Sequence, residues 1–242
     1  MHSYFISDLH LCPERPELTR AFSAFMQDLA PTAEKLYILG DLFEYWIGDD
    51  GSTLIGADEV LELMAETSKK VECFFIAGNR DFLVRKKFSE RTGFTILADE
   101  TVVDLYGTPT LLLHGDSLCI DDVKHQEYRR KLMCNKLMCW LVLMLPLSYR
   151  LKRAEGARAQ SKGRRESMDI TIMDVAERAV IDGFESNQVT QMIHGHTHRQ
   201  AIHDHQTKLG AAKRYVLGDW GATNSILTVS ENGLVIDNQS ID

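Results

Sequence analysis

Short hydrophobic runs alternate along the chain with longer segments in which hydrophobic residues recur at helical spacing. The short runs are typical of buried strands, and the longer segments are typical of amphipathic helices. The pattern predicts strands at residues 3–6, 36–39, 73–77, 101–105, 110–113, 191–193, 215–217, 226–229 and 234–236. It predicts helices at residues 18–29, 54–70, 83–92 and 168–182. This alternation of strands and helices favours an α/β fold.

Polar side chains follow five of these strands at the point where each strand ends. The stretch 35–50 shows this most clearly, because the run 36–39 stops at Gly40 and Asp41. In open α/β sheets, the carboxyl ends of the strands are where ligands bind. The side chains that follow the five strands are those of Asp8 and His10, Asp41, Asn79, His114, and His196 with His198. We therefore expect these residues to form one site.

The chemistry of these side chains favours a pair of metal ions. A single aspartate or histidine at a strand end is usually structural, but a set on successive strands is hard to explain in that way. The set combines imidazole, carboxylate and amide groups without a thiolate, which disfavours a structural zinc site and suits an ion such as Mn²⁺. Two divalent ions about 3.5–4 Å apart can stabilise both the attacking and the leaving oxygen of a phosphoryl transfer.

The segment 124–165 differs in composition from the rest of the chain. It contains twelve Lys and Arg residues against two Glu, a net charge of +10 in a chain whose formal net charge is −8. Within it, residues 137–147 form a hydrophobic block that is too short to cross a bilayer, which requires about 20 residues. One interpretation is a helical hairpin packed on the core. The other is a cap with an apolar groove and a basic rim, suited to an anionic lipid or a membrane surface.

Length and composition exclude several classes of protein. The 242 residues fit one domain with a small insertion, and a net charge of −8 argues against general attraction to nucleic acid. The five cysteines form no C-x-x-C pair, which argues against a disulfide framework and favours the reducing cytoplasm. Met1 leads directly into a predicted strand, and we find neither a signal-peptide pattern nor a hydrophobic segment that predicts a transmembrane helix.

Five short motifs resemble those of a known superfamily. They are Asp8-Leu9-His10, Gly40-Asp41, Gly78-Asn79-Arg80-Asp81, His114-Gly115-Asp116 and Gly195-His196-Thr197-His198. In order and spacing they resemble the calcineurin-like metallophosphoesterases. The resemblance implies an α/β fold in which two sheets form a sandwich flanked by helices. Residues 1–121 and 168–242 would form its core, and residues 122–167 would form an inserted helical cap for a lipid substrate.

Longer motifs resemble one family within this superfamily, the UDP-2,3-diacylglucosamine hydrolases of lipid A biosynthesis. The motifs cover residues 7–11, 39–44, 46–50, 78–83, 118–122 and 172–175. The resemblance implies a pyrophosphohydrolase with two Mn²⁺ ions per chain. Its substrate would be UDP-2,3-diacylglucosamine, attacked at the α-phosphorus to give UMP and 2,3-diacylglucosamine 1-phosphate. The resemblance also implies a peripheral enzyme at the cytoplasmic face of the bacterial inner membrane, with no protein partner evident.

The same resemblance implies roles for individual residues. One metal would be held by Asp8, His10, Asp41 and His198. The other would be held by Asp41, Asn79, His114 and His196, so that Asp41 bridges the two. The residues expected to contact substrate are Asn79, Arg80, Asp122, Ser161 and His196. Those expected to act directly in catalysis are Asp41, Asn79, Arg80 and His196.

Arg80 stands where many metallophosphoesterases have a histidine that protonates the leaving group. A phosphate leaving group is stable without this proton, and a guanidinium can bind its oxygens through two hydrogen bonds. Arg80 therefore favours a pyrophosphate substrate over a simple ester. In the cap, Arg165 and Met168 stand where the family usually has an asparagine and a lysine that contact substrate, so those roles are not carried over. Arg164 or Arg165 is a candidate for the missing cation.

Other polar residues have structural interpretations. We expect His194 to lie in the core or behind the metal ligands, and Asp81 and Asp116 to orient ligands. Gly218-Asp219-Trp220 is interpreted as a turn. Two other functions stay open: a phosphodiesterase or pyrophosphatase for a soluble nucleotide, and a scaffold that has kept the fold and lost activity. The apolar block in the cap argues against the first, and the intact ligand set argues against the second.

Overall fold

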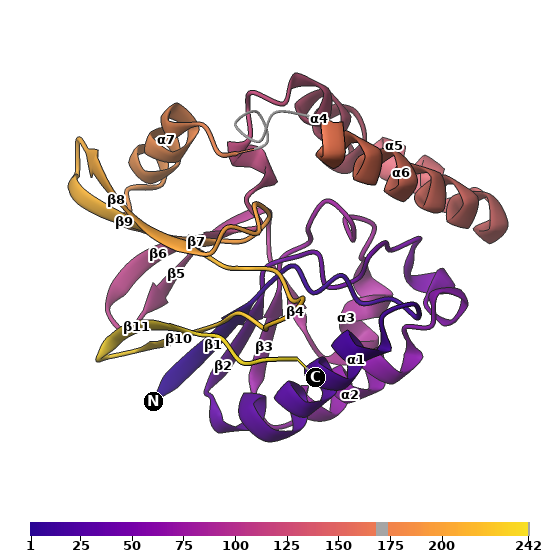
Figure 1. Cartoon of the computed structure of the whole chain (residues 1–242), viewed down its shortest axis with the longest axis horizontal. Helices are drawn as coiled ribbons and strands as arrows, with labels where there is room; N and C mark the ends of the chain where they lie inside the picture. The colour runs from indigo at the N-terminus through magenta and orange to yellow at the C-terminus, as the bar shows by residue number, and fades with distance from the viewer. Residues whose placement is uncertain (168–173, 242) are drawn as a thin grey trace.

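Two β-sheets pack face to face, and helices cover the outer face of each sheet (Figure 1). The computed structural model describes residues 1–167 and 174–241, and for residues 160–167 it describes the backbone alone. The strands are β1 (His2–Ile6), β2 (Lys35–Ile38), β3 (Glu72–Phe75), β4 (Thr95–Ile96), β5 (Glu100–Leu105), β6 (Thr108–Leu113), β7 (Gln191–His194), β8 (Ala201–Thr207), β9 (Gly210–Val216), β10 (Ile226–Ser230) and β11 (Gly233–Asp237). The α-helices are α1 (Pro16–Ala24), α2 (Asp58–Ser68), α3 (Lys86–Thr92), α4 (Val123–Tyr128), α5 (Lys136–Leu143), α6 (Leu147–Ser167) and α7 (Glu177–Asn187). Short π-helical turns at Phe25–Leu29 and Arg129–Met133 extend α1 and α4, and 3₁₀ turns lie at Ala30–Thr32, Asp49–Gly51, Thr53–Ile55 and Asp116–Leu118.

The strand order brings several carboxyl ends to the same edge of the sandwich. The first sheet has the order β11-β10-β1-β2-β3-β4, in which β1 to β4 are parallel. The second has the order β5-β6-β7-β9-β8, in which β6, β7 and β9 are parallel. The loops after neighbouring parallel strands meet at one edge, which is where α/β sheets bind ligands.

Three hydrophobic clusters hold the layers together, because the central strands are apolar on both faces. On β1, Phe5 belongs to the cluster between the two sheets, whereas Ile6 belongs to the cluster beneath α1, α2 and α3. The third cluster packs the second sheet against α7 through Phe184. The layers are therefore α/β/β/α, which confirms the predicted two-sheet sandwich.

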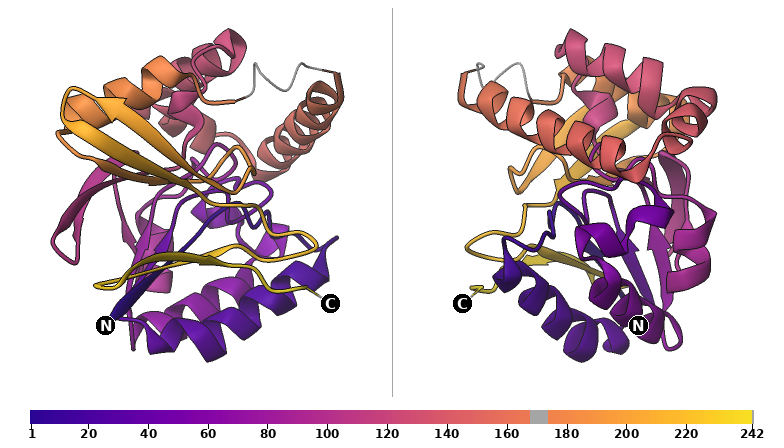
Figure 2. Two further views of the ribbon diagram at one scale, coloured as in Figure 1. Left: turned by 60° about the vertical axis from the view of Figure 1, so that its left-hand side comes forward. Right: turned by 90° about the vertical axis from the view of Figure 1, so that its right-hand side faces the viewer.

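Helices α4, α5 and α6 lie together at the end of the molecule toward which β1, β2 and β3 run (Figures 1 and 2). Cys139 of α5 is buried in the cluster beneath α1 to α3, and Leu147 of α6 packs against that cluster. Arg150 is only 5% exposed. Its guanidinium donates to the carbonyl oxygen of Ile47 and, at 2.8 and 2.5 Å, to the two carboxylate oxygens of Asp50. These contacts fasten the base of the three-helix segment to the core.

The structure corrects several predicted boundaries. The helix predicted at 168–182 is confirmed for residues 177–182 but begins later than predicted and ends later, because Ala176 is extended and α7 runs from Glu177 to Asn187. Residues 168–173, including Met168, lie outside the described residues. The strand predicted at 110–113 begins two residues earlier than predicted, since Thr108 and Pro109 lie within β6 and Pro109 pairs with Asp104.

Two strands were not predicted. β4 has only two residues, and β8 carries polar residues on an exposed edge of its sheet, so neither has a clear hydrophobic signal. In the part of the chain that the structure covers, no helix is both long enough and apolar enough to cross a membrane.

Candidate metal centre

The structure brings all seven predicted ligands together at the carboxyl ends of the strands. The residues after β1 are Asp8 and His10, the residue after β2 is Asp41, and the residue after β3 is Asn79. The second sheet supplies His114 after β6, and His196 and His198 after β7. Ligands from both sheets therefore meet where the two sheets approach at this edge.

One group of donor atoms is formed by Asp8, His10 and His198. The two histidine Nε2 atoms lie 3.3 Å apart, and His198 Nε2 lies 3.3 Å from Asp8 Oδ1. Asp8 Oδ1 is buried and faces His198 Nε2, while Asp8 Oδ2 accepts from the Ser7 hydroxyl and the His196 amide. An anionic oxygen with this environment fits a cation, so the group can hold a metal ion.

A second group of donor atoms surrounds His114. Its Nε2 lies 3.1 Å from Asn79 Oδ1, 3.2 Å from His196 Nδ1 and 3.6 Å from Asp41 Oδ1. His114 Nδ1 lies 2.8 Å from the carbonyl oxygen of Leu39, to which it can only donate. In the neutral imidazole this contact leaves the lone pair on Nε2, which faces the site and is the tautomer that a metal ligand needs.

Asp41 lies between the two groups. Its Oδ2 is 4.0 Å from His10 Nε2 in the first group, and its Oδ1 is 3.6 Å from His114 Nε2 in the second. Oδ1 also accepts a hydrogen bond from the Arg80 amide at 2.8 Å. Position 78 has room only for glycine, because a Cβ there would collide with Asp41 Oδ1. One carboxylate thus presents an oxygen to each group.

The backbone of the site is strained. Non-glycine residues rarely adopt positive φ angles, and doing so costs about 1–3 kcal/mol each. In residues 1–167 and 174–241, seven non-glycine residues do so, and five of them are predicted ligands. These five are Asp8 (56°), His10 (50°), Asp41 (51°), His196 (67°) and His198 (59°). Strain concentrated in this way is typical of a functional site that its surroundings hold in place.

Asp81 holds two of the ligand loops together. Its carboxylate accepts hydrogen bonds from the amides of Gly78, Asp41 and Leu42. It makes no direct contact with a histidine ligand that the structure records, so it orients the loops through their backbone. Burial, reinforced by Asp41, raises the pKa of Asp81 to about 7.

Electrostatic interactions within the site are strong. Burial opposes ionisation of Asp8, but His198, His114 and His10 hold its pKa well below the usual range. Burial would lower the pKa of His114, yet Asp41, Asp8 and Asp116 raise it to about 9. Burial and His114 together lower the pKa of His196 well below its usual value. The site therefore favours an ionised carboxylate at Asp8 and a neutral, ligand-ready imidazole at His196.

Three residues near the site were not predicted to contribute to it. Asp219 Oδ2 lies 3.3 Å from His198 Nδ1, so the sequence Gly218-Asp219-Trp220 is more than a turn: it supplies a carboxylate that orients a ligand. Glu44 Oε2 lies 3.7 Å from His10 Nδ1. His125 of α4 stacks on His196, with ring centroids 5.8 Å apart. The sequence signal for Asp219 was the repeated Gly-Asp pair, and Glu44 lay in the motif at 39–44 without an assigned role. His125 had no sequence signal.

The structure describes the side chains of some of the predicted substrate contacts and not of others. Arg80 is largely buried, with a side chain 13% exposed, and one of its terminal nitrogens lies 3.9 Å from Glu44, so it is not a surface arginine. Asp122 caps α4 by accepting from the His125 amide. The side chains of Ser161 and Arg165 lie outside the described residues, so their roles stay predictions.

Asp116 and His194 do not contact the metal groups directly. Asp116 lies 3.0 Å from Arg129 and 3.5 Å from His125, so it joins the core to α4 and the turn after it rather than orienting a ligand. His194 is fully buried, as predicted, and burial together with Arg214 lowers its pKa to about 3.

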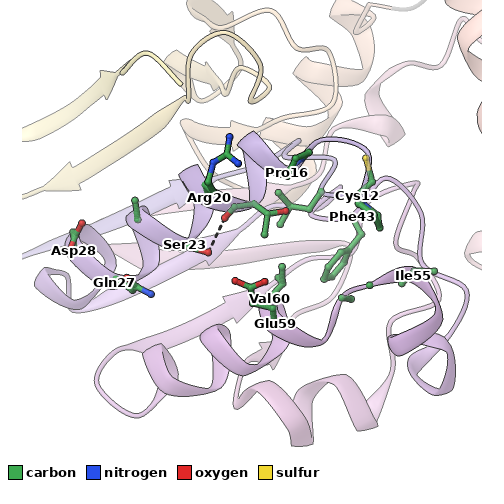
Figure 3. Close-up of a pocket in the computed structure, with 16 residues that line it drawn as sticks. Cys12, Pro16, Arg20, Ser23, Gln27, Asp28, Phe43, Ile55, Glu59 and Val60 are labelled. Carbon is green, nitrogen blue, oxygen red and sulfur yellow. Dashed lines mark hydrogen bonds between the residues drawn. The ribbon is translucent and has the colours of Figure 1, made fainter. Parts of the chain in front are cut away.

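A groove of about 540 Å³ lies elsewhere, between α1 and α2 (Figure 3). Its walls include Pro16, Arg20, Phe43, Ile55 and Val60. None of the seven predicted ligands lines it, so it is separate from the candidate metal centre.

Comparison with known proteins agrees with this geometry. Residues 1–200 match the calcineurin-like phosphoesterase family, and the chain belongs to that family. The solved structure of a dimetal phosphatase from Danio rerio shares the fold, with a TM-score of 0.51 and 13% identity over 100% of this chain and 96% of that one. Several relatives within the family are named UDP-2,3-diacylglucosamine hydrolase, and two of them illustrate the similarity. The relative from Histophilus somni (strain 2336) is 48% identical over 96% of this chain and 97% of its own. The relative from Pasteurella multocida (strain Pm70) is 49% identical over 95% of this chain and 94% of its own. The chain belongs to the group of phosphoesterases that these two hydrolases represent, which confirms the resemblance inferred from its motifs.

Proposed function

We propose that this chain hydrolyses the pyrophosphate bond of UDP-2,3-diacylglucosamine in lipid A biosynthesis. The oxygen of a water molecule bonds to the α-phosphorus, and the bond from that phosphorus to the bridging oxygen breaks. The products are UMP and 2,3-diacylglucosamine 1-phosphate. The observation that carries the proposal is the pair of donor groups with Asp41 between them. It is supported by the 48% identity of this chain to the relative named UDP-2,3-diacylglucosamine hydrolase.

Two divalent metal ions, with Mn²⁺ as the proposed species, fit the two donor groups. Asp8, His10 and His198 would hold one ion, and Asn79, His114 and His196 would hold the other. Asp41 would contribute one carboxylate oxygen to each. When bound, such ions lower the pKa of water and neutralise the charge that develops on phosphate oxygens. The donor set supports this proposal because it is rich in imidazole and contains no thiolate.

The chain's own residues would bind and orient the diphosphate. The backbone amide of Arg80 donates to Asp41 Oδ1, and its side chain is largely buried near Glu44. We propose that its guanidinium, which carries five N–H donors, binds the oxygens of the departing sugar phosphate. The ring of His196 stacks on His125 of α4. We propose that it also contacts the phosphate under attack. Asp122, Ser161 and Arg165 are proposed contacts from the cap.

Residues 122–167 are proposed to form the cap that receives the two acyl chains, with residues 1–121 and 168–242 as the catalytic core. The block 137–147 is packed on the core on one side only, and on the other it exposes large hydrophobic side chains. These include Leu137 (63% exposed), Trp140 (56%), Leu141 (44%) and Met144 (68%). Exposed apolar side chains beside many basic residues fit a lipid with an anionic headgroup, and support a peripheral position at the cytoplasmic face of the inner membrane.

The test is UMP release from UDP-2,3-diacylglucosamine by purified protein, with Mn²⁺ present or removed by chelation. A deacylated UDP-glucosamine serves as the matched substrate. We expect turnover of the acylated substrate that depends on the metal, with little turnover of the deacylated one. Equal turnover of both would refute the lipid assignment and favour a soluble nucleotide as substrate. Folded, metal-bound protein that releases no UMP from either would refute the proposed reaction.

A further inference from the structure

A buried chain of polar side chains lies behind the loop that carries His196 and His198, and the proposed chemistry does not use it. Arg214 of β9 lies at its centre, on a strand between β7 and β8 (Figure 1). Arg214 is 6% exposed, His194 is 0% exposed and His205 is 6% exposed. Burying a guanidinium between two imidazoles costs folding free energy unless its hydrogen bonds are satisfied, so its presence at this position needs an explanation.

The hydrogen bonds among these buried side chains all run outward from Arg214. Arg214 can only donate, and it does so from Nε to His205 Nε2 at 3.3 Å and from a terminal nitrogen to His194 Nε2 at 3.1 Å. Both imidazoles must therefore carry their proton on Nδ1. From there His205 donates to Glu177 at 2.9 Å, and His194 donates to the carbonyl oxygen of Gly195 at 2.8 Å. Each imidazole nitrogen in this path therefore has a partner of the right kind.

On the His194 side, this series of hydrogen bonds ends at the backbone that positions the candidate ligands His196 and His198. Gly195 O accepts from His194 Nδ1 and also from the Thr197 amide at 2.9 Å, so it fixes the turn between His196 and His198. That turn holds both ligands at positive φ, 67° and 59°. A strained conformation persists only where its surroundings over-determine it. Space around Gly195 is also restricted, because a Cβ there would collide with Asp8 Oδ2.

We propose that Arg214 is a positioning residue, which acts through His194 and Gly195 to hold His196 and His198 in the geometry that binds metal. The proposal rests on the metal centre described above. Two donors in one rigid plane are required, because one must reach each imidazole. A guanidinium supplies both, whereas the single ammonium of lysine cannot. Outer residues of this kind typically change metal affinity or activity by about 10–100-fold when they are replaced.

The experiment compares Arg214→Met and Arg214→Lys with Lys213→Met. Lys213 is the neighbouring residue on β9, is exposed and pairs only with Asp204 among the recorded contacts, so it controls for loss of a positive charge on this strand. Mn²⁺ affinity is measured by electron paramagnetic resonance without substrate, together with the melting temperature, kcat and KM. We expect both Arg214 variants to bind Mn²⁺ about 10–100-fold more weakly and to have a lower kcat with KM nearly unchanged. Lys213→Met should match the wild type.

A purely structural role would give a different result. If the Arg214 variants melt earlier but keep wild-type Mn²⁺ affinity and an unchanged spectrum, the proposal is overturned. Millimolar guanidinium should restore Mn²⁺ binding to Arg214→Ala, and failure to do so in folded protein also counts against it. If Arg214→Met does not fold, His205→Leu tests the same path, because leucine has no acceptor and leaves Arg214 in place without one of its partners. Wild-type protein that binds Mn²⁺ without releasing UMP would refute the proposed reaction and leave this inference standing on the affinity data.

Discussion

The loops that carry the candidate metal ligands and the three-helix segment that we propose as the cap are built in opposite ways. In the loops, Asp8 and Asp41 are 0% and 1% exposed, and their carboxylates contact backbone amides or neighbouring ligands. In the cap, Trp140 and Met144 are 56% and 68% exposed. Under the proposed function, a reaction at phosphorus needs ligands held to within fractions of an ångström, whereas a lipid chain needs a hydrophobic surface of tolerant shape. We propose that the two regions meet these two demands separately.

The two regions nevertheless meet at a few charged contacts. Arg158 of α6 lies 3.1 Å from Glu44, and the same carboxylate lies 3.7 Å from the metal-ligand candidate His10. Arg129 and His125 reach Asp116 at the base of the cap. These contacts connect the cap directly to the site. Substitutions in the two regions can be distinguished by whether they mainly alter kcat or KM.

The largest effect is expected for Asp41→Asn. This change removes the carboxylate that faces both donor groups, so turnover should fall by more than about 100-fold, beyond the range for residues outside the metal ligands. Burial raises the pKa of Asp41, which means that its charge destabilises the metal-free fold at neutral pH. The variant should therefore melt at the same or a higher temperature than the metal-free wild type. Asp237→Asn, on exposed β11, is the control for both UMP release and melting. Activity within a few-fold of the wild type would contradict a shared ligand.

The next largest effect is expected for Arg80→Lys. Loss of a charged, two-pronged hydrogen bond to a phosphate should lower kcat roughly 10- to 100-fold, since such bonds contribute about 1.5–3 kcal/mol. Hydrolysis of a p-nitrophenyl phosphodiester should fall less, because its leaving group carries no phosphate. The control is Arg20→Lys, an exposed arginine at the groove between α1 and α2 (Figure 3). An equal loss on both substrates would mean that Arg80 does not act on the leaving group.

The site was easier to predict from sequence than its surroundings. Each ligand follows a hydrophobic run, and the topology of parallel strands then gathers these residues at one edge. The contacts of Asp219 and Arg214 could not be found in this way. Asp219 lies in an irregular turn, and Arg214 is buried only because His194 and His205 on adjacent strands accept its hydrogen bonds. No local pattern encodes a partner from another strand.

The elements that were missed had weak or misleading periodicity. Residues 201–207 form β8 although His203, Asp204 and His205 interrupt any hydrophobic alternation. The strand forms because its backbone pairs with β9 along its full length. The helix predicted at 168–182 placed apolar residues at helical spacing, but at the Ala176 position the backbone turns extended and its amide bonds to Leu118 O instead. Tertiary contacts decided both segments.

A smaller effect, confined to the cap, is expected for the double change Trp140→Ser and Met144→Ser. Burying a large hydrophobic side chain contributes about 1.5–3 kcal/mol, so KM for the acylated substrate should rise about tenfold or more, with kcat nearly unchanged. Binding to anionic phospholipid vesicles in a sedimentation assay should weaken as well. The control is Val235→Ser, because Val235 is 58% exposed on β11, away from the cap. Unchanged KM and vesicle binding would separate the cap from lipid recognition.

The smallest effect is expected for Asp50→Asn, which weakens the contact between the cap and the core. Asp50 accepts two hydrogen bonds from the buried guanidinium of Arg150, which lowers the pKa of Asp50 below its usual value. A folded-state pKa below the unfolded value near 4 stabilises the fold above that pH, and the stabilisation is lost as the pH falls through the folded-state pKa. The Asp50 side chain is 48% exposed, so solvent limits the contribution to about 1 kcal/mol or less.

Urea unfolding at a series of pH values from 7 down to the acid limit of the fold tests this prediction. The wild type should be the more stable protein at pH 7, and the difference should shrink as the pH falls below about 4, because protonated Asp50 no longer carries the charge that Asn lacks. Glu66→Gln, which removes an exposed pair with Lys69 on α2, is the control and should change stability less. A difference that is the same at every pH would show that the carboxylate holds the cap by shape and hydrogen bonding, and that charge contributes nothing to the contact.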